Sequence, residues 1–491
     1  MRMTKKAMRR LSNRLLVPLG LVALGVVVWR ALAVSITHDE AFTYLHYGRL
    51  SWGEILLFKG LPLANNHVLN TLLLKLSSQW FGVTTFALRL PNLIFASFYF
   101  FYAALLAKKF THPLSTVMAF VILCAQPYLF DFFALARGYG MALALLLGAI
   151  YHLYEYHHLQ NGNHTYRTLI FAGLAAYANL TFLYAYLALV ALLLMLAFAE
   201  GVNRREWLRL IRAELVVSLI LGVLIYLPLT RIQGDLTGGE RGFWQDTVLS
   251  LTAKLGYHPQ PWVELIWQLA MAILLVLGIV GTIYDLYIKH EVRRDQFYHV
   301  VLFWILLILL VSTGLHGLLG VPWLQGRMAL VYVPLFLSLV LFMALRLIIP
   351  SAFNWVPKIA MSLIAVGLLV HFVHKYSPRS TLDWNYDRSS KKIYQALARE
   401  QDRQPDSARQ SSGQAEVYTH WLYEPSLNFY RLSKKARWLD EIERRDYYPA
   451  DYLLLDTLRQ DSLYRAIPQE HYQKIRKFEP GLVLFQKKEK G

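Results

Sequence analysis

Two adjacent carboxylates, Asp39 and Glu40, follow the first long apolar stretch of the sequence, within the segment 37–42. A carboxylate at this position can cap the helix that follows. It can also act as a general base, which takes the proton from an attacking hydroxyl or amine. A base that serves a lipid-linked substrate must lie at the depth of the lipid head group, so the position suits either interpretation.

Two arginines, Arg137 and Arg327, stand where later apolar stretches begin. A guanidinium group binds phosphate through two parallel hydrogen bonds. Asp131 lies shortly before Arg137, and these two side chains could instead pair with each other at a helix end. Arg327 could also extend to the membrane interface without any ligand. We favour phosphate contact for Arg327, because the topology described below places it on the same side of the membrane as Asp39.

Four further polar residues, one of them Asp131, are candidates for contact with a substrate. His67 falls on the polar face of an amphipathic stretch, where a solvated histidine is the expected state. His258 stands in a long loop, and such loops often line binding sites. Tyr139 closely follows Arg137. A metal site built from Asp39, Glu40 and histidines is conceivable, but no residues have ligand spacing, so we expect no required metal or other cofactor.

The composition is that of a membrane protein. Of the 491 residues, 56% are hydrophobic and only 17% are charged, against roughly 25% charged residues in soluble domains. The net charge of +18 raises the alternative of nucleic-acid binding. The basic residues lie in short clusters between apolar runs, however, which is typical of membrane topology signals, and we predict no nucleic-acid partner. The single cysteine, Cys124, excludes a disulfide within the chain and a cysteine-based zinc site.

About eleven apolar stretches are long enough to span a membrane. The first has a basic N-terminal flank and no cleavage site after it, so we interpret it as an uncleaved helix with a cytoplasmic N-terminus. The predicted spans are 15–34, 86–107, 113–130, 138–156, 167–180, 182–199, 211–229, 263–285, 297–316, 328–349 and 356–376.

The side of each loop follows from its basic residues. Lys and Arg cluster in every second loop, which places those loops in the cytoplasm and, with an odd number of spans, places the C-terminus outside. The segment 66–81, within an outer loop of residues 35–85, has one apolar and one polar helical face. We predict that it lies in the membrane interface, because a spanning helix here would turn the later basic loops outward.

The composition changes after the predicted membrane domain, residues 1–376. The remaining segment, 377–491, is rich in charge and has no long apolar run. Short strand-like runs at 416–419, 452–456 and 482–486, with helix-like segments at 389–400 and 457–466, predict a small soluble α/β domain. The segment 401–415 is polar and is predicted to form a loop.

Several motifs together resemble the GT-C superfamily of membrane glycosyltransferases, and within it the protein O-mannosyltransferases and the aminoarabinose transferases that modify lipid A. The resemblance covers about residues 10–350 and includes the topology, and it rests on the following motifs. They are the acidic pair at 39–40, the segment 62–67 before the amphipathic helix, Phe81-Gly82 followed by 87–91, the segments 127–131 and 136–139, and Gln325-Gly326-Arg327 with Pro334.

The resemblance implies roles for individual residues. Asp39 would be the catalytic base or would orient the acceptor, and Glu40 would support it. Arg137 and Arg327 would hold the phosphate of the lipid donor. The sequence departs from the mannosyltransferases in having Tyr139 after Arg137 where an acidic residue is usual. It also lacks the double proline after the interfacial histidine, and both departures leave the acceptor unassigned.

These features predict a GT-C glycosyltransferase, with about eleven transmembrane helices, in the plasma (inner) membrane. It would move a sugar from a polyprenyl-phosphate donor to an acceptor protein, lipid or glycan on the outer face, with inversion in a single displacement. The alternative is a flippase or transporter of lipid-linked saccharides, a class in which internal repeats and mid-span charges are more usual. A membrane-anchored scaffold, whose C-terminal domain does the work, would need neither the acidic pair nor the arginines.

Overall fold

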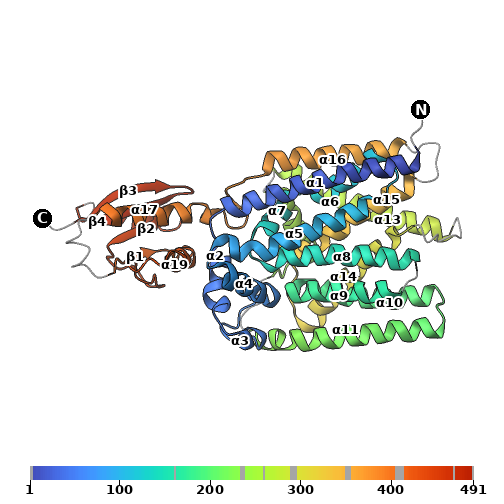
Figure 1. The fold of residues 1–491 in the computed structure, drawn as a ribbon, viewed down its shortest axis with the longest axis horizontal. Helices are drawn as coiled ribbons and strands as arrows, with labels where there is room; N and C mark the ends of the chain where they lie inside the picture. Colours follow the sequence, from blue (N-terminus) through green and yellow to red (C-terminus); the bar gives the residue numbers. More distant parts are fainter. Residues whose placement is uncertain are drawn as a thin grey trace.

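A computed structural model describes residues 4–159, 162–232, 238–257, 260–287, 296–348, 355–403, 414–467 and 470–488. It has two parts, a bundle of long helices and a small domain built on a β-sheet (Figure 1). The sheet domain lies at one end of the bundle, and the N-terminus of the chain lies at the opposite end. Most of the predicted loop at 401–415 lies outside the described residues.

Long helices form the bundle. They are α1 (Lys5–Ala33), α5 (Thr85–Ala107), α6 (Pro113–Cys124), α7 (Pro127–Ala134), α8 (Gly138–Leu159), α9 (Gly162–Ala178), α10 (Leu183–Ala199), α11 (Arg204–Arg231), α13 (Pro261–Tyr287), α14 (Tyr298–Leu319), α15 (Tyr332–Ile348) and α16 (Trp355–Lys375). Within the described ranges, eight helices are long and apolar enough to cross a membrane, or nine if α6 and α7, bent by 63°, form one span. The chain is a multi-pass membrane protein.

The remaining two of the eleven predicted spans correspond to α8 and α9, which are helical but less apolar. Tyrosine, histidine and glycine residues lower the mean hydropathy of α8, and α9 has only 17 residues. The two helices pack closely against each other, and α8 is buried over most of its length. Neighbouring helices therefore shield them, so they need less apolar surface than a lipid-facing span.

Short helices cover the end of the bundle that faces the sheet domain (Figure 1). Helix α2 (His38–Thr43) continues into the π-helix η1 (Tyr44–Gly48), and α3 (Trp52–Leu56) follows. Helix α2 begins with a capping box, in which the Thr37 backbone N–H donates to Glu40 Oε2 at 3.0 Å and the Glu40 N–H donates to Thr37 Oγ1 at 3.4 Å. This cap fixes the start of α2 directly after α1, which places Asp39 in the first turn.

The predicted interfacial segment forms helix α4 (Val68–Phe81), and its polar side faces the protein. Asn70, Thr71 and Lys75 are buried, whereas the apolar Trp80 and Phe81 are exposed. This orientation is the reverse of that in a water-soluble protein and suits a helix whose outer side contacts lipid. The polar face of α4 is therefore available to build the interior of this end of the bundle.

The remaining short elements connect the long helices or belong to the C-terminal domain. They are α12 (Ser250–Leu255), the helical turns η2 (Leu180–Phe182), η3 (Phe243–Leu249), η4 (Gly326–Val331) and η5 (Asn385–Ser389), the helices α17 (Ser390–Arg403), α19 (Glu424–Ser433) and α20 (Asp461–Ala466), and the strands β1 (Val417–Thr419), β2 (Tyr452–Asp456), β3 (Tyr472–Phe478) and β4 (Leu482–Lys487).

The four strands form one sheet in the order β1-β2-β4-β3. Strands β1 and β2 are parallel, and β4 is antiparallel to both of its neighbours. The predicted strands correspond to β1, β2 and β4, which are buried. Strand β3 was not predicted, because in its sequence YQKIRKF three of the seven residues are charged and four are exposed, as expected at the edge of a sheet.

Asp387 joins the C-terminal domain to α2. Its carboxylate accepts hydrogen bonds from the His38 N–H at 2.6 Å, from Ser426 Oγ at 2.8 Å and from Ser390 Oγ at 3.0 Å. Nearby, the Ile36 N–H donates to the Tyr430 hydroxyl at 2.9 Å. The domain is thus attached at the residues on either side of the N-cap of α2.

This junction gives a first prediction, on pH. Burial raises the pKa of Asp387 to about 7, although hydrogen bonds from His38, Ser426 and Ser390 lower it. A carboxyl whose pKa is higher in the folded state binds its proton more tightly there, so its contribution to stability is lost as the pH rises through about 7. We expect the melting temperature of the wild type to fall between about pH 5 and about pH 8 more steeply than that of Asp387→Asn.

In Asp387→Asn, the amide oxygen can accept from His38 while the amide nitrogen donates to the serine hydroxyls, so the junction should survive. Thermal unfolding of the two purified proteins across this pH range is the measurement. Equal slopes for the wild type and the variant would contradict the assignment of the titrating group to Asp387.

Candidate active site

Asp39 lies between two arginines at the end of the bundle nearest the C-terminal domain. Its Oδ2 atom is 3.2 Å from Nη2 of Arg327 and 3.5 Å from Nη2 of Arg137. The three residues come from different elements: the first turn of α2, the link between α7 and α8, and η4. The chain therefore brings together the predicted base and both predicted phosphate-binding residues, although each role stays a prediction.

The arginines set the charge of the site. Burial by itself would raise the pKa of Asp39, but the guanidinium groups of Arg137 and Arg327 outweigh it and hold the pKa below its ordinary value. Asp39 is thus an ionised carboxylate at neutral pH. Two guanidinium groups share this one carboxylate, so the cluster carries an excess positive charge that an anionic ligand would balance.

Arg137 is held in place from several sides. It donates to Thr43 Oγ1 at 3.0 Å, to the Asn65 carbonyl at 3.3 Å and to the Asn65 side chain. Its Nε is buried without a hydrogen-bond partner in the described structure. The next residue is Gly138, where a Cβ atom would lie 2.0 Å from the carbonyl oxygen of Ala178. Only glycine permits this close approach of α8 to α9, which fixes the position of Arg137.

Arg327 is more accessible. Its side chain is 34% exposed, and its guanidinium lies over the ring of Trp384 at 4.8 Å from the ring centre. Trp384 belongs to the segment that connects the last long helix to the C-terminal domain, and its side chain also forms a hydrogen bond that lowers the pKa of Asp39. Arg327 can therefore contact a ligand while it remains in contact with Asp39 and Trp384.

Glu40, the second predicted catalytic carboxylate, is fully buried and points away from the arginine pair. It forms an ion pair with Arg89 of α5, with Arg89 Nη2 2.6 Å from Oε2 and Arg89 Nε 2.8 Å from Oε1. Glu40 Oε1 also accepts from the backbone N–H of Ala136 at 2.7 Å. Both oxygens are occupied, so Glu40 positions α2 and the residue before Arg137, and its predicted role in support of Asp39 stays a prediction.

Asp131 does not pair with Arg137. Its carboxylate forms an ion pair with Arg30 of α1 and accepts hydrogen bonds from the Tyr257 hydroxyl and the Leu382 N–H, both at 2.8 Å. The alternative pairing with Arg137 is therefore wrong, because the bend after α7 turns the two side chains to different partners. Asp131 instead joins α1 to the loop around Tyr257 and to the connection at Leu382.

His67 is buried, so the expectation of a solvated histidine is wrong. Its ring lies edge-on to Tyr139, with 5.3 Å between ring centres, and its Nε2 has no hydrogen-bond partner in the described structure. Burial, with Arg137 and Arg327 nearby, holds the pKa of His67 well below its usual value, so the ring is neutral. Tyr139 is also buried. The predicted residue His258 lies outside the described residues.

Sequence reasoning missed several residues that build the site. Arg89 had a detectable signal, because a lone arginine inside an apolar span needs an anionic partner. Asn65 lies in the segment 62–67, which belongs to the motifs of the resemblance, but no role was assigned to it. Trp384 had no signal, since neither its residue type nor its spacing marks it. For metals, the described ranges contain no cluster of three or more His, Cys, Asp or Glu side chains that could hold an ion.

Comparison with known proteins gives a result at the level of structure alone. No family model and no curated protein sequence matches this chain. Solved structures do match, among them ArnT from Cupriavidus metallidurans bound to undecaprenyl phosphate and ArnT from the same organism in the apo state. Each has a TM-score of 0.52 and 11% identity, covering 96% of this chain and 97% of that chain.

The chain has the GT-C fold. This confirms the predicted fold class, an α-helical polytopic membrane protein with a small C-terminal α/β domain. The match extends over nearly the whole chain, so the GT-C fold includes the C-terminal domain as well as the bundle. At 11% identity the likeness shows the fold and leaves the residues of the site to be judged by their geometry.

Proposed function

We propose that this protein is a glycosyltransferase that takes its sugar from a polyprenyl-phosphate lipid. The observation that carries the proposal is the Asp39 carboxylate held between Arg137 and Arg327. A solved structure with the same fold is bound to undecaprenyl phosphate, which supports a lipid of this class as the donor. The positive excess of the cluster suits the phosphate of such a donor.

In the proposed reaction, the phosphate of the donor binds to Arg137 and Arg327, and the acceptor hydroxyl or amine lies against Asp39. The acceptor atom attacks the anomeric carbon and forms the new bond, while the bond from that carbon to the phosphate oxygen breaks. The electron pair leaves with the polyprenyl phosphate, whose charge the two arginines stabilise. The acceptor proton passes to the Asp39 carboxylate.

Two consequences follow from this arrangement. The leaving group is a phosphate monoester, which needs no protonation, so the site requires one base and no general acid. A single displacement inverts the configuration of the anomeric carbon. His67, neutral and buried beside Tyr139, is available as a further hydrogen-bonding group near the arginines.

The proposed location is the outer face of the plasma (inner) membrane. The site and the C-terminal domain lie at one end of the bundle, and the N-terminus lies at the other (Figure 1). The clusters of Lys and Arg in alternate loops favour a cytoplasmic N-terminus. The site and the domain would then face outward, at the depth where the head group of a lipid donor lies.

Proteoliposomes test the proposal against the transport alternative. The full chain is reconstituted with a polyprenyl-phosphate sugar labelled in the sugar, and a membrane extract supplies the acceptor. We expect release of free polyprenyl phosphate and transfer of the label to the extract. Movement of the intact labelled lipid between leaflets, without any release of polyprenyl phosphate, would overturn the enzyme and support a flippase.

A further inference from the structure

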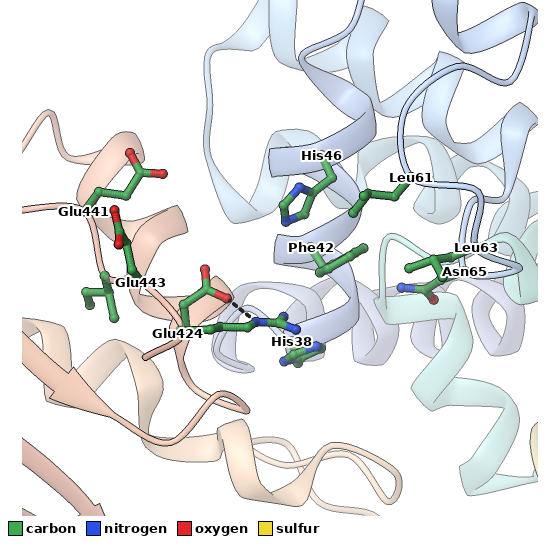
Figure 2. Close-up of a pocket in the computed structure, with 11 residues that line it drawn as sticks. His38, Phe42, His46, Leu61, Leu63, Asn65, Glu424, Glu441 and Glu443 are labelled. Carbon is green, nitrogen blue, oxygen red and sulfur yellow. Dashed lines mark hydrogen bonds and ion pairs between the residues drawn. The ribbon is translucent and has the colours of Figure 1, made fainter. Parts of the chain in front are cut away.

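A cavity separates α2 from the C-terminal domain, beside the arginine cluster. Its volume is about 570 Å³, which falls in the range of roughly 300–1,000 Å³ that is usual for small-molecule sites. Figure 2 shows Phe42 and His46 on one side of the cavity and Glu441 and Glu443 of the C-terminal domain across from them. We propose that this cavity binds the acceptor and that it recognises a neutral sugar ring; this inference rests on the proposed function.

The cavity reaches the reacting groups through two residues. His38, which lines it, is followed directly by Asp39. Asn65, which also lines it, accepts hydrogen bonds from Arg137 through its carbonyl and its side chain. A molecule that contacts Asn65 in the cavity is therefore separated from Arg137 by the Asn65 residue alone. This places the cavity next to the cluster of Asp39 and the two arginines.

Aromatic groups give the cavity a surface that suits sugars. The rings of His38 and Phe42 are nearly parallel, with 6.1 Å between their centres, one helical turn apart on α2. The ring of Trp421, which is 49% exposed, lies edge-on to His38 at 5.6 Å. Aromatic side chains such as these combine an apolar body with polar edges. His38 and Phe42 line the cavity but are almost fully buried, whereas Trp421 lies next to the cavity and is half exposed. An exposed ring of this kind can pack against the C–H face of a sugar ring while the sugar hydroxyls point elsewhere.

The charged groups around the cavity are already neutralised. Glu424 pairs with Arg444 at 2.9 Å, Glu441 with Arg431 at 2.7 Å, and Glu443 with Arg445. A carboxylate in such a pair has lost most of its attraction for a cation but keeps lone pairs that accept hydroxyl hydrogen bonds. This pattern favours an uncharged, hydroxyl-rich ligand, such as a sugar ring of a glycan or glycolipid, over an amine or a phosphate.

The inference also gives the C-terminal domain a role. Helix α19 and the segment after it supply Glu424 and Arg444, and the bundle supplies His38 and Phe42. Neither part forms the cavity alone. The guanidinium of Arg444 lies 5.8 Å from the ring centre of Phe42 and 5.7 Å from that of Trp421, so it connects the two walls. The domain would therefore complete the acceptor site.

Single-site labelling tests the inference without requiring turnover. The one native cysteine, Cys124, is buried, so Glu443→Cys introduces a unique accessible thiol at the cavity wall. Asp461→Cys, at the start of α20, is the matched control on the same domain. Maleimide labelling of each variant is followed with rising concentrations of methyl glycosides, and separately with a short Ser/Thr-containing peptide.

We expect at least one methyl glycoside to slow the labelling of Glu443→Cys and not that of Asp461→Cys. Protection by the peptide alone, or by neither probe, would overturn the sugar specificity.

We also expect labelled Glu443→Cys to transfer sugar to the membrane extract at least about tenfold more slowly, while binding undecaprenyl phosphate as before. Normal transfer by the labelled protein would overturn the site. If a glycoside protects the thiol of Glu443→Cys but the wild-type protein transfers no sugar, the sugar-binding cavity stands and only the proposed function is contradicted.

Discussion

Arg89→Met is expected to lower the free energy of unfolding by about 3–5 kcal/mol, the usual cost of leaving one member of a buried ion pair without its partner. Both side chains of the Arg89–Glu40 pair are fully buried. Arg89 also donates to the carbonyl oxygens of Ala31 and Val34 at 2.8 Å, which belong to the C-terminal end of α1 and the residue after it. The loss of Arg89 therefore leaves the buried Glu40 carboxylate without its ion-pair partner and leaves the nearby carbonyl oxygens without a hydrogen-bond donor.

Reversible unfolding of the purified protein in mixed detergent micelles measures this effect. Arg205→Met, at an exposed position in the first turn of α11, is the matched control and should leave stability unchanged within about 0.5 kcal/mol. The double variant Arg89→Met with Glu40→Leu should recover part of the loss, because it removes the unpaired charge. Equal stability of Arg89→Met and Arg205→Met would show that the pair does not hold α2 to α5.

Arg137→Ala is expected to slow sugar transfer by about 100-fold to 1,000-fold, the cost typical of removing one preorganised donor from a developing negative charge. Arg137→Lys should fall between the wild type and Arg137→Ala, because it keeps the charge and loses the planar fork that binds phosphate bidentately. The affinity for undecaprenyl phosphate should weaken in the same order.

Initial rates and equilibrium binding of undecaprenyl phosphate are the two measurements. Arg231→Ala is the control, since Arg231 is an exposed arginine in the last turn of α11 that donates to the Leu57 carbonyl. If Arg137→Ala bound the lipid phosphate as tightly as Arg231→Ala, the phosphate role of Arg137 would be wrong, whatever the effect on rate.

Much of the architecture was predictable from the sequence because lipid restricts the choices. An apolar stretch in a membrane protein forms a helix, since no other open structure satisfies its backbone. Charges at the ends of such helices need partners or ligands, so Asp39, Arg137 and Arg327 stood out by type and position. The structure brings these three side chains together, and their chemical roles remain to be measured.

The rest of the site depends on contacts between distant parts of the chain. Nothing in the sequence near Glu40 indicates that Arg89, rather than an acceptor, occupies its oxygens. Trp384 and Asp387 reach the site only because the C-terminal domain folds back onto α2. The burial of His67 was also unpredictable, because the polar face of α4 turns toward the protein and the apolar face turns outward. Amphipathic periodicity identifies the two faces of a helix but does not say which environment each one meets.

The most direct measurement compares wild type with Asp39→Asn in the initial rate at which each releases polyprenyl phosphate. The donors are a panel of radiolabelled polyprenyl-phosphate sugars, and a membrane extract supplies the acceptor. The variant keeps the size of the side chain and removes the base. The control is Glu264→Gln, in the first turn of α13, which removes the charge of a carboxylate whose hydrogen-bond partner is Gln268. We predict that wild type and Glu264→Gln consume one donor and that Asp39→Asn does so at least about 100-fold more slowly. Equal rates for all three proteins would contradict Asp39 as the base.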